Sequence, residues 1–214
     1  MTKKLRLKKL GPNIYCIVAS SHHLLASTFV RLQEFYESPY KQIKGKHFTL
    51  THFKSLYAKD KGGFTYYEDW AGFNVPGNVV LEFFHKFKDL SPKERRLKKL
   101  LTDALKSSIR FYVIGVPRRS NQDVVSHELA HAFYYTMPSF KRAMRVAIKR
   151  ISPKVKRQVF SKLREMKYCN NVLPDELQAY LATTKMRHLK EFFGYGITIF
   201  HTLPFRRVFN SFRE

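Results

Sequence analysis

The chain has 214 residues, of which 44% are hydrophobic and 15% aromatic. A chain of this length and composition buries one hydrophobic core, which argues against a disordered protein and predicts a single globular domain. It carries 40 Lys and Arg against 16 Asp and Glu, a formal net charge of +24. Such a charge attracts anionic partners: nucleic acid, an anionic membrane face or an acidic protein. It is also typical of a chain that reflects the base composition of its genome, or of a lysine-rich surface that keeps a protein soluble.

The two cysteines, Cys16 and Cys169, are too few for a disulfide framework. The first residues are basic, but the segment after them is too mixed for a signal peptide. We also find no run of about 18 apolar residues that would predict a membrane span. We therefore expect a soluble, cytoplasmic protein, with delivery to another compartment left open.

The first half of the chain predicts one strand and a series of helices. Residues 1–12 form a basic lead, and Ile14–Val18 is an apolar, β-prone run that predicts a buried strand. Apolar side chains then recur at helical spacing, and the predicted helices run from Ser20 or Ser21 to a point before Pro39, from near Thr51, from Val79 to Phe87, and from Ser91 to about Ser107. The last of these begins with a capping box, Ser91-Pro92-Lys93-Glu94.

A weaker signal lies between these helices. Phe64–Tyr67 alternates and predicts a strand, and a loop over 68–77 follows it. This loop forms either the rim of a substrate cleft or a structured turn, and we favour a turn in which Trp70 and Phe73 fill the core.

The second half is predicted to be mainly helical after one strand, Ile109–Val116, which Pro117 ends. Helices are then expected from near Ser120 to Met137, over Ser139–Arg150, from Ser152 to Met166, and from Pro174 to about Arg187. An aromatic, glycine-interrupted tail completes the chain.

The first of these helices contains the sequence His-Glu-Leu-Ala-His at residues 127–131. Residues four apart lie on one face of a helix, so His127 and His131 can direct two imidazoles at a single ion. Glu128 is rotated by about 100° from His127. Its carboxylate is therefore expected beside a metal, where it can take a proton from a bound water.

A second motif supports a metal site. Zinc needs a third protein ligand, and an open fourth position if it is catalytic. Pro174 is a suitable first residue for a helix, and acidic residues favour the first turn. Glu176 is therefore expected near the start of a second helix, where it completes a His, His, Glu set.

These two motifs resemble the zincin metallopeptidases of the gluzincin type over the segment from Ile109 to Lys185. The resemblance implies that His127, His131 and Glu176 bind Zn²⁺ and that Glu128 is the general base. There are two departures: Tyr180 stands where a common gluzincin pattern has an acidic residue, and Met137 where metzincins have a third histidine.

The resemblance also bears on the strand at Ile109–Val116. In zincins, a strand just before the active-site helix often lies at the edge of the cleft and pairs with extended substrate. The alternative is an ordinary strand inside a sheet.

Tyr180 lies one turn after Glu176 on the same helix face, where it hydrogen-bonds a ligand, polarises a substrate carbonyl, or simply packs in the core. His188 is an alternative oxyanion donor, and Cys169 an alternative metal ligand.

Residues 141–167 carry eleven Lys or Arg against one acid, Glu165, and lie between the two predicted ligand helices. The run predicts a surface for DNA, RNA or another polyanion, although no nucleic-acid motif accompanies it.

Together these features predict an α+β fold, a mostly helical domain over 13–190 with a small sheet, and a tail over 191–214 packed on it. The predicted function is zinc-dependent hydrolysis of peptide bonds in a protein or peptide substrate, with Glu128 and Tyr180 as catalytic residues. The alternative is a polyanion-binding protein with a structural or vestigial metal site.

Overall fold

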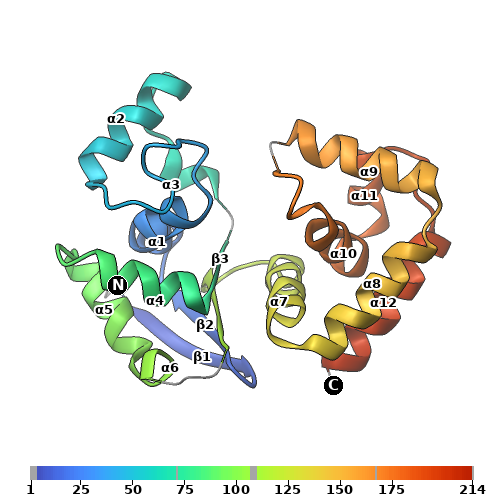
Figure 1. Ribbon diagram of the computed structural model, residues 1–214, viewed down its shortest axis with the longest axis horizontal. Coiled ribbons are helices and arrows are strands. Elements are labelled where there is room, and N and C mark those ends of the chain that lie inside the picture. The colour runs from blue at the N-terminus through green and yellow to red at the C-terminus, as the bar shows by residue number, and fades with distance from the viewer. Residues whose placement is uncertain (1–3, 71, 107–109, 167, 214) are drawn as a thin grey trace. The chain divides into compact units, whose positions relative to one another are not determined.

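The computed structural model describes residues 4–70, 72–106, 110–166 and 168–213 (Figure 1). The fold is α+β, mostly helical with one four-stranded sheet, as the sequence predicts. The chain divides into two compact units, Met1–Asn121 and Gln122–Glu214, where the sequence analysis expects one domain over 13–190 and a tail. Each unit is described by itself.

The N-terminal unit contains the sheet. Its strands are Leu5–Gly11 (β1), Ile14–Ala19 (β2), Phe73–Pro76 (β3) and Tyr112–Pro117 (β4), in the spatial order β1-β2-β4-β3. β1 pairs antiparallel with β2, β2 parallel with β4, and β3 antiparallel with β4. The predicted strand at Ile14–Val18 is thus confirmed, and the basic lead over 1–12 contains a strand of the same sheet.

The predicted substrate-binding role of Ile109–Val116 is not supported. The strand that forms, β4, lies between β2 and β3 and pairs with both. Over residues 112–115 its backbone hydrogen-bonding groups are used on both sides, so this part of the strand has no free edge for an extended peptide. The alternative, an ordinary interior strand, is correct, and residue 109 lies outside the described residues.

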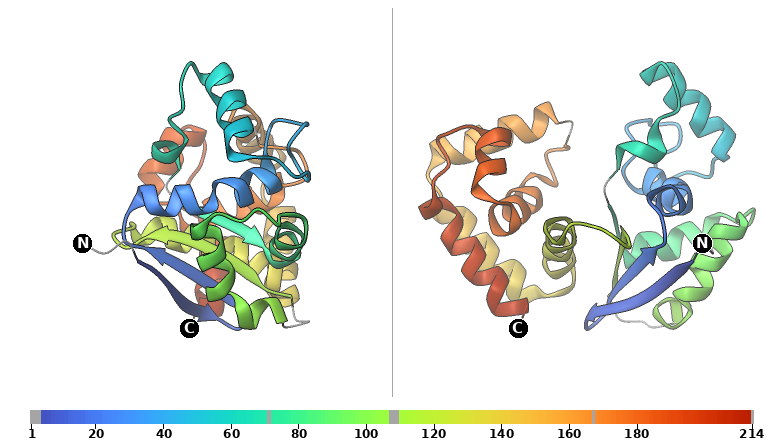
Figure 2. Two further views of the ribbon diagram at one scale, coloured as in Figure 1. Left: turned by 90° about the vertical axis from the view of Figure 1, so that its left-hand side faces the viewer. Right: turned by 180° about the vertical axis from the view of Figure 1, so that it is seen from behind.

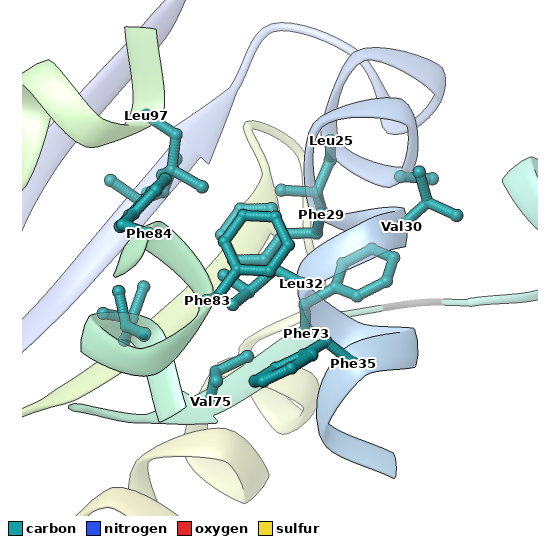
Figure 3. Packing of buried hydrophobic residues seen from close by; sticks show 14 of the residues in the cluster. Leu25, Phe29, Val30, Leu32, Phe35, Phe73, Val75, Phe83, Phe84 and Leu97 are labelled. Atoms are coloured by element: carbon teal, nitrogen blue, oxygen red, sulfur yellow. The ribbon is translucent and has the colours of Figure 1, made fainter. Parts of the chain in front are cut away.

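The helices of this unit are His22–Glu37 (α1), Leu50–Lys61 (α2), Tyr66–Asp69 (α3), Gly77–Lys86 (α4), Pro92–Leu100 (α5) and Thr102–Lys106 (α6). α1 packs on β2, β3 and β4 and carries much of the core. Figure 3 shows Leu25, Phe29 and Phe35 of α1 close to Phe73 and Phe83. The rings of Phe29 and Phe73 stack with their centroids 5.3 Å apart. The apolar period that predicts this helix is therefore the face that it buries.

A buried cation joins α1 to the start of α5. The Arg31 guanidinium donates to both carboxylate oxygens of Glu94, at 2.8 and 2.6 Å, and to Asp89 at 2.9 Å. Glu94 also accepts from the backbone N–H of Ser91 at 2.7 Å, within the predicted capping box. One carboxylate thus both caps a helix and neutralises a buried charge.

The segment between α2 and α4 differs from the prediction. Phe64–Tyr67 does not form a strand: Tyr66 begins the short helix α3, and its ring is fully buried in an aromatic cluster. The carboxylate of Asp69 accepts hydrogen bonds from Thr65 and Tyr57, which stabilises this turn. In the predicted loop, Phe73 opens strand β3 and is buried, whereas Trp70 is 40% exposed, so only Phe73 fills the core.

In its described residues, the C-terminal unit consists of helices joined by loops and contains no strand. Its helices are Gln122–Thr136 (α7), Pro138–Arg150 (α8), Pro153–Glu165 (α9), Leu173–Thr183 (α10), Met186–Phe193 (α11) and Ile199–Arg213 (α12). α10 packs against α7, α8, α9 and α12, and Figures 1 and 2 show it among them. α12, from the aromatic tail, contacts both α8 and α10.

Most predicted boundaries in this unit agree with the structure, with one exception. The helix expected from Pro174 to about Arg187 ends at Thr183, and α11 begins at Met186. His188 therefore lies within a separate helix. None of the described helices is long and apolar enough to span a membrane.

Candidate metal centre

Two histidines of α7 lie with their ring nitrogens close together. His127 and His131 are one turn apart, and their Nε2 atoms are separated by 3.2 Å. The side chain of His131 is 4% exposed and that of His127 is 19% exposed. The helix therefore presents both imidazoles on one face, as the four-residue spacing predicts.

Glu176 completes the group from the first turn of α10. Its Oε1 lies 3.6 Å from Nε2 of His131, and its Oε2 lies 3.8 Å from Nε2 of His127. With one ligand atom taken from each residue, the three atoms all lie within 4.8 Å of one another. Pro174 stands at the start of α10 and places Glu176 in the first turn, beside α7. The structure thus brings together the three residues that the sequence predicts as metal ligands.

The spacing of these atoms fits a tetrahedral zinc ion. Zinc binds imidazole nitrogen and carboxylate oxygen at about 2.0–2.2 Å, so adjacent ligand atoms of a tetrahedral site lie about 3.3–3.6 Å apart. Nε2 of His131 lies 3.2 Å from Nε2 of His127 and 3.6 Å from Oε1 of Glu176, and both separations are close to that range. The 3.8 Å contact with His127 is made by the other oxygen, Oε2, and with one oxygen per carboxylate the three ligand atoms lie within 4.8 Å of one another. Two imidazoles and one carboxylate also form the donor set of catalytic zinc sites that keep a fourth position open.

A second carboxylate orients one of the histidines. Oδ1 of Asp175 lies 3.0 Å from Nδ1 of His131, on the opposite side of the ring from Nε2. Gln178 donates from Nε2 to Asp175 at 2.9 Å and to the carbonyl of Ala130 at 3.3 Å. The contact with Asp175 fixes the His131 ring and its tautomer, and it leaves Nε2 of His131 to bind a metal. No sequence pattern predicts this role for Asp175, although it directly precedes a predicted ligand.

The carboxylates around His131 favour a positive charge at the centre. Burial alone would lower the pKa of His131, but the carboxylates of Asp175, Glu176 and Glu128 outweigh it and raise the pKa to about 10. Burial and the neighbouring His131 hold the pKa of His127 well below its ordinary value. The protein thus offers one neutral imidazole and a surplus of negative charge, which is a suitable environment for a cation.

Glu128, the predicted base, is 8% exposed and lies in the same helical turn as His127. Its charge contributes to raising the pKa of His131, Tyr168 and Tyr180, so its carboxylate is near all three. It therefore stays a candidate base next to the ligand set.

Tyr180 packs against the centre with its ring edge-on to His127, at a centroid distance of 4.8 Å. Its hydroxyl is hydrogen-bonded to that of Tyr168, a residue that the sequence analysis did not single out. Burial, and then the charges of Glu176 and Glu128, raise the pKa of both phenols, so each keeps its proton at neutral pH. Two neutral hydroxyl donors therefore adjoin the ligands. Tyr168 lies between α9 and α10, so no helical spacing in the sequence could have singled it out.

The alternative site residues lie elsewhere. His188 pairs with Glu191 at 2.9 Å, and its side chain is 44% exposed. Within the described residues, the His, Cys, Asp and Glu group that could hold an ion comprises His127, His131 and Glu176 and does not include Cys169, which is exposed.

Comparisons of the chain with protein-family models, with curated proteins and with solved structures found no match. The functional conclusion therefore depends on the residues of the centre.

Proposed function

We propose that the protein is a zinc-dependent metallopeptidase in which His127, His131 and Glu176 hold the metal. One observation carries this proposal: three ligand atoms from α7 and α10 converge within 4.8 Å, in the donor set of catalytic zinc sites. The resemblance to gluzincins supports it, because the same three residues carry that resemblance.

The chemistry that zinc supplies in such a site is polarisation of a carbonyl and a water pKa lowered towards about 7. Glu128 accepts the proton of the attacking water and passes a proton to the leaving amine. Tyr180, and Tyr168 through it, provides a hydroxyl donor for the oxygen that becomes negative during attack. Asp175 keeps Nε2 of His131 directed at the ligand position.

The test combines metal content with hydrolysis. Wild type, Glu176→Ala and Glu128→Gln are purified, zinc is measured by mass spectrometry, and cleavage of a mixed peptide library is followed. We expect one equivalent of zinc in wild type and Glu128→Gln, its loss in Glu176→Ala, and hydrolysis by wild type alone.

The matched control is Glu165→Gln, which changes an exposed carboxylate of α9. It should keep both zinc and activity. Hydrolysis that survives in Glu128→Gln would exclude Glu128 as the base, and unchanged zinc in Glu176→Ala would exclude the proposed ligand set.

A second candidate function is supported by the basic run at 141–167. Its exposed cations on α8 and α9 are Arg142, Arg145, Lys149, Arg150, Lys154, Arg157, Lys162 and Arg164. The acid of this run, Glu165, pairs with Lys162 at 2.7 Å, so most of the positive charge remains available to a polyanion. Binding to DNA or RNA that weakens steeply with salt, and weakens further when Arg142, Arg145 and Lys149 become Gln, would support this function. Salt-dependent binding without cleavage of any peptide would favour it over the peptidase.

A further inference from the structure

A pocket of about 240 Å³ lies at the start of α7, in the C-terminal unit. Its lining includes Asp123 from the first turn of α7, Lys185 just after α10, and Arg206 and Arg213 from α12. Three of these four charged side chains are cationic. The pocket therefore combines a volume that suits one side chain with a positive lining.

Its charges are not fully balanced by one another. Lys185 pairs with Asp123 at 3.1 Å. The positive charges of Arg206 and Arg213 therefore exceed the negative charge in the pocket lining. Arg206 is held in place because its Nη2 donates to the carbonyl of Thr184 at 2.8 Å. Its Nε is buried and has no hydrogen-bond partner among the described residues. A buried N–H without an acceptor is costly, so the protein satisfies the Arg206 guanidinium only in part.

The pocket adjoins the metal centre along α7. Asp123 precedes His127 by four residues, so the two lie on one face of the helix, about 6 Å apart along its axis. Ser126, which also lines the pocket, is the residue before His127. An extended peptide advances about 3.3 Å per residue. A group bound in the pocket would therefore belong to a residue one or two positions from the bond at the metal.

We propose that this pocket binds a carboxylate of the substrate, so that the enzyme selects acidic peptides. A guanidinium donates two parallel hydrogen bonds to a carboxylate, and two guanidinium-bearing residues, Arg206 and Arg213, line the pocket. A single pocket of this volume suits one anionic side chain or a chain terminus better than a continuous phosphodiester backbone. The inference rests on the proposed peptidase function and names its substrate class.

The experiment measures binding, using the full chain with Glu128→Gln so that bound peptide is not cleaved. Three short peptides are compared: one with a single Glu and an amidated C-terminus, its Gln counterpart, and the Gln peptide with a free C-terminus. Because hydrogen bonds to charged groups contribute about 1.5–3 kcal/mol, a carboxylate-bearing peptide should bind about tenfold tighter or more than the neutral one. The peptide that gains affinity identifies the source of the carboxylate, a side chain or the chain terminus.

Arg206→Gln should remove this preference, so that the carboxylate-bearing peptide binds no more tightly than the neutral one. The matched control is Arg207→Gln, on the next residue of α12, which is exposed and does not line the pocket. Arg213→Gln serves as a second pocket variant if Arg206→Gln does not fold. Equal affinities for all three peptides, or the same loss of preference in Arg207→Gln, would overturn the proposal.

Cleavage assays on the wild-type protein separate this proposal from the peptidase function. If wild type cleaves no peptide but the preference depends on Arg206, the carboxylate pocket stands and the peptidase assignment falls. If wild type cleaves neutral and acidic peptides equally, the pocket proposal falls alone. Inorganic phosphate that competes more strongly than acetate would identify a phosphate site and overturn the carboxylate assignment.

Discussion

Nδ1 of His131 lies 3.0 Å from Oδ1 of Asp175, the residue directly before the proposed ligand Glu176. A common gluzincin pattern has an acidic residue four positions after the ligand, and this chain has Tyr180 there. The structure supplies a carboxylate from the other side of Glu176 instead, and it contacts the second histidine. Although Tyr180 replaces the usual acidic residue, the proposed ligands therefore still have an orienting carboxylate, that of Asp175.

We predict that Asp175→Asn lowers zinc affinity about 10–100-fold, the range typical of partners that orient a ligating histidine. The amide keeps the size of the side chain but removes the negative charge that fixes the His131 ring. Competition with a chromogenic chelator measures the affinity, and circular dichroism checks the fold.

The control for this prediction is Asp103→Asn, an exposed acid of the N-terminal unit. An affinity in Asp175→Asn that equals that of this control would contradict an orienting role for Asp175.

The grouping of His127, His131 and Glu176 was predictable because its signals are local. The spacing of His127 and His131 determines their common helix face, and Pro174 followed by acids predicts a helix start at Glu176. Asp175 and Tyr168 act through tertiary contacts. Nothing in the sequence shows which of two adjacent acids faces both histidines, or that a tyrosine between α9 and α10 reaches Tyr180.

The difference between local signals and tertiary contacts also decides which parts of the fold were predictable. α1 and α5 were predictable from apolar spacing and from the Ser91–Glu94 capping box. The segment around Tyr66 was not, because its aromatic residues suit a strand as well as a helix. Burial of the Tyr66 ring and the hydrogen bonds to Asp69 decide its conformation. The role of β4 within the sheet depends on pairing with β3, a four-residue strand too short to read from sequence.

Gly115 tests the packing of the sheet against α1. A Cβ at this position would lie 2.9 Å from the ring of Phe29 and 3.1 Å from Leu25, both of them buried. Gly115→Ala should therefore destabilise the N-terminal unit by about 1–3 kcal/mol, the usual cost of overpacking. Urea unfolding followed by the fluorescence of Trp70, the single tryptophan, reports on this unit.

Gly63→Ala is the matched control, since a Cβ there meets nothing within 4 Å. It should be neutral or slightly stabilising. If the two alanine variants unfold at the same urea concentration, the close approach to Phe29 is not a constraint.

The two cysteines should differ in reactivity. Cys16 is buried in β2, and burial raises the pKa of its thiol to about 11, so it holds little thiolate at pH 8. Cys169 is exposed. Alkylation of the native protein, followed by peptide mass spectrometry, should modify Cys169 within minutes and Cys16 only after unfolding. Equal rates for both in the native protein would show that the N-terminal unit opens readily around β2.

Glu34 provides a test of pH dependence. It is 5% exposed on α1, and burial raises its pKa despite the hydroxyls of Ser38 and Tyr66 that face it. A raised pKa means that the folded state binds the proton more tightly than the unfolded state. Glu34 therefore destabilises the fold increasingly as the pH rises from its ordinary pKa through the raised one.

Glu34→Gln removes that charge and should raise the stability of the N-terminal unit at pH 7 by an amount on the order of 1 kcal/mol. The difference from wild type should shrink at pH 4, where the carboxyl is mostly protonated in both folded and unfolded chains. Thermal unfolding followed by Trp70 fluorescence at the two pH values measures this difference. Glu68→Gln, at an exposed position, should show no such pH-dependent gain, because its carboxylate remains in water in the folded state. A Glu34→Gln protein that is less stable than wild type at pH 7 would mean that the ionised carboxylate is held by its neighbours rather than penalised by burial.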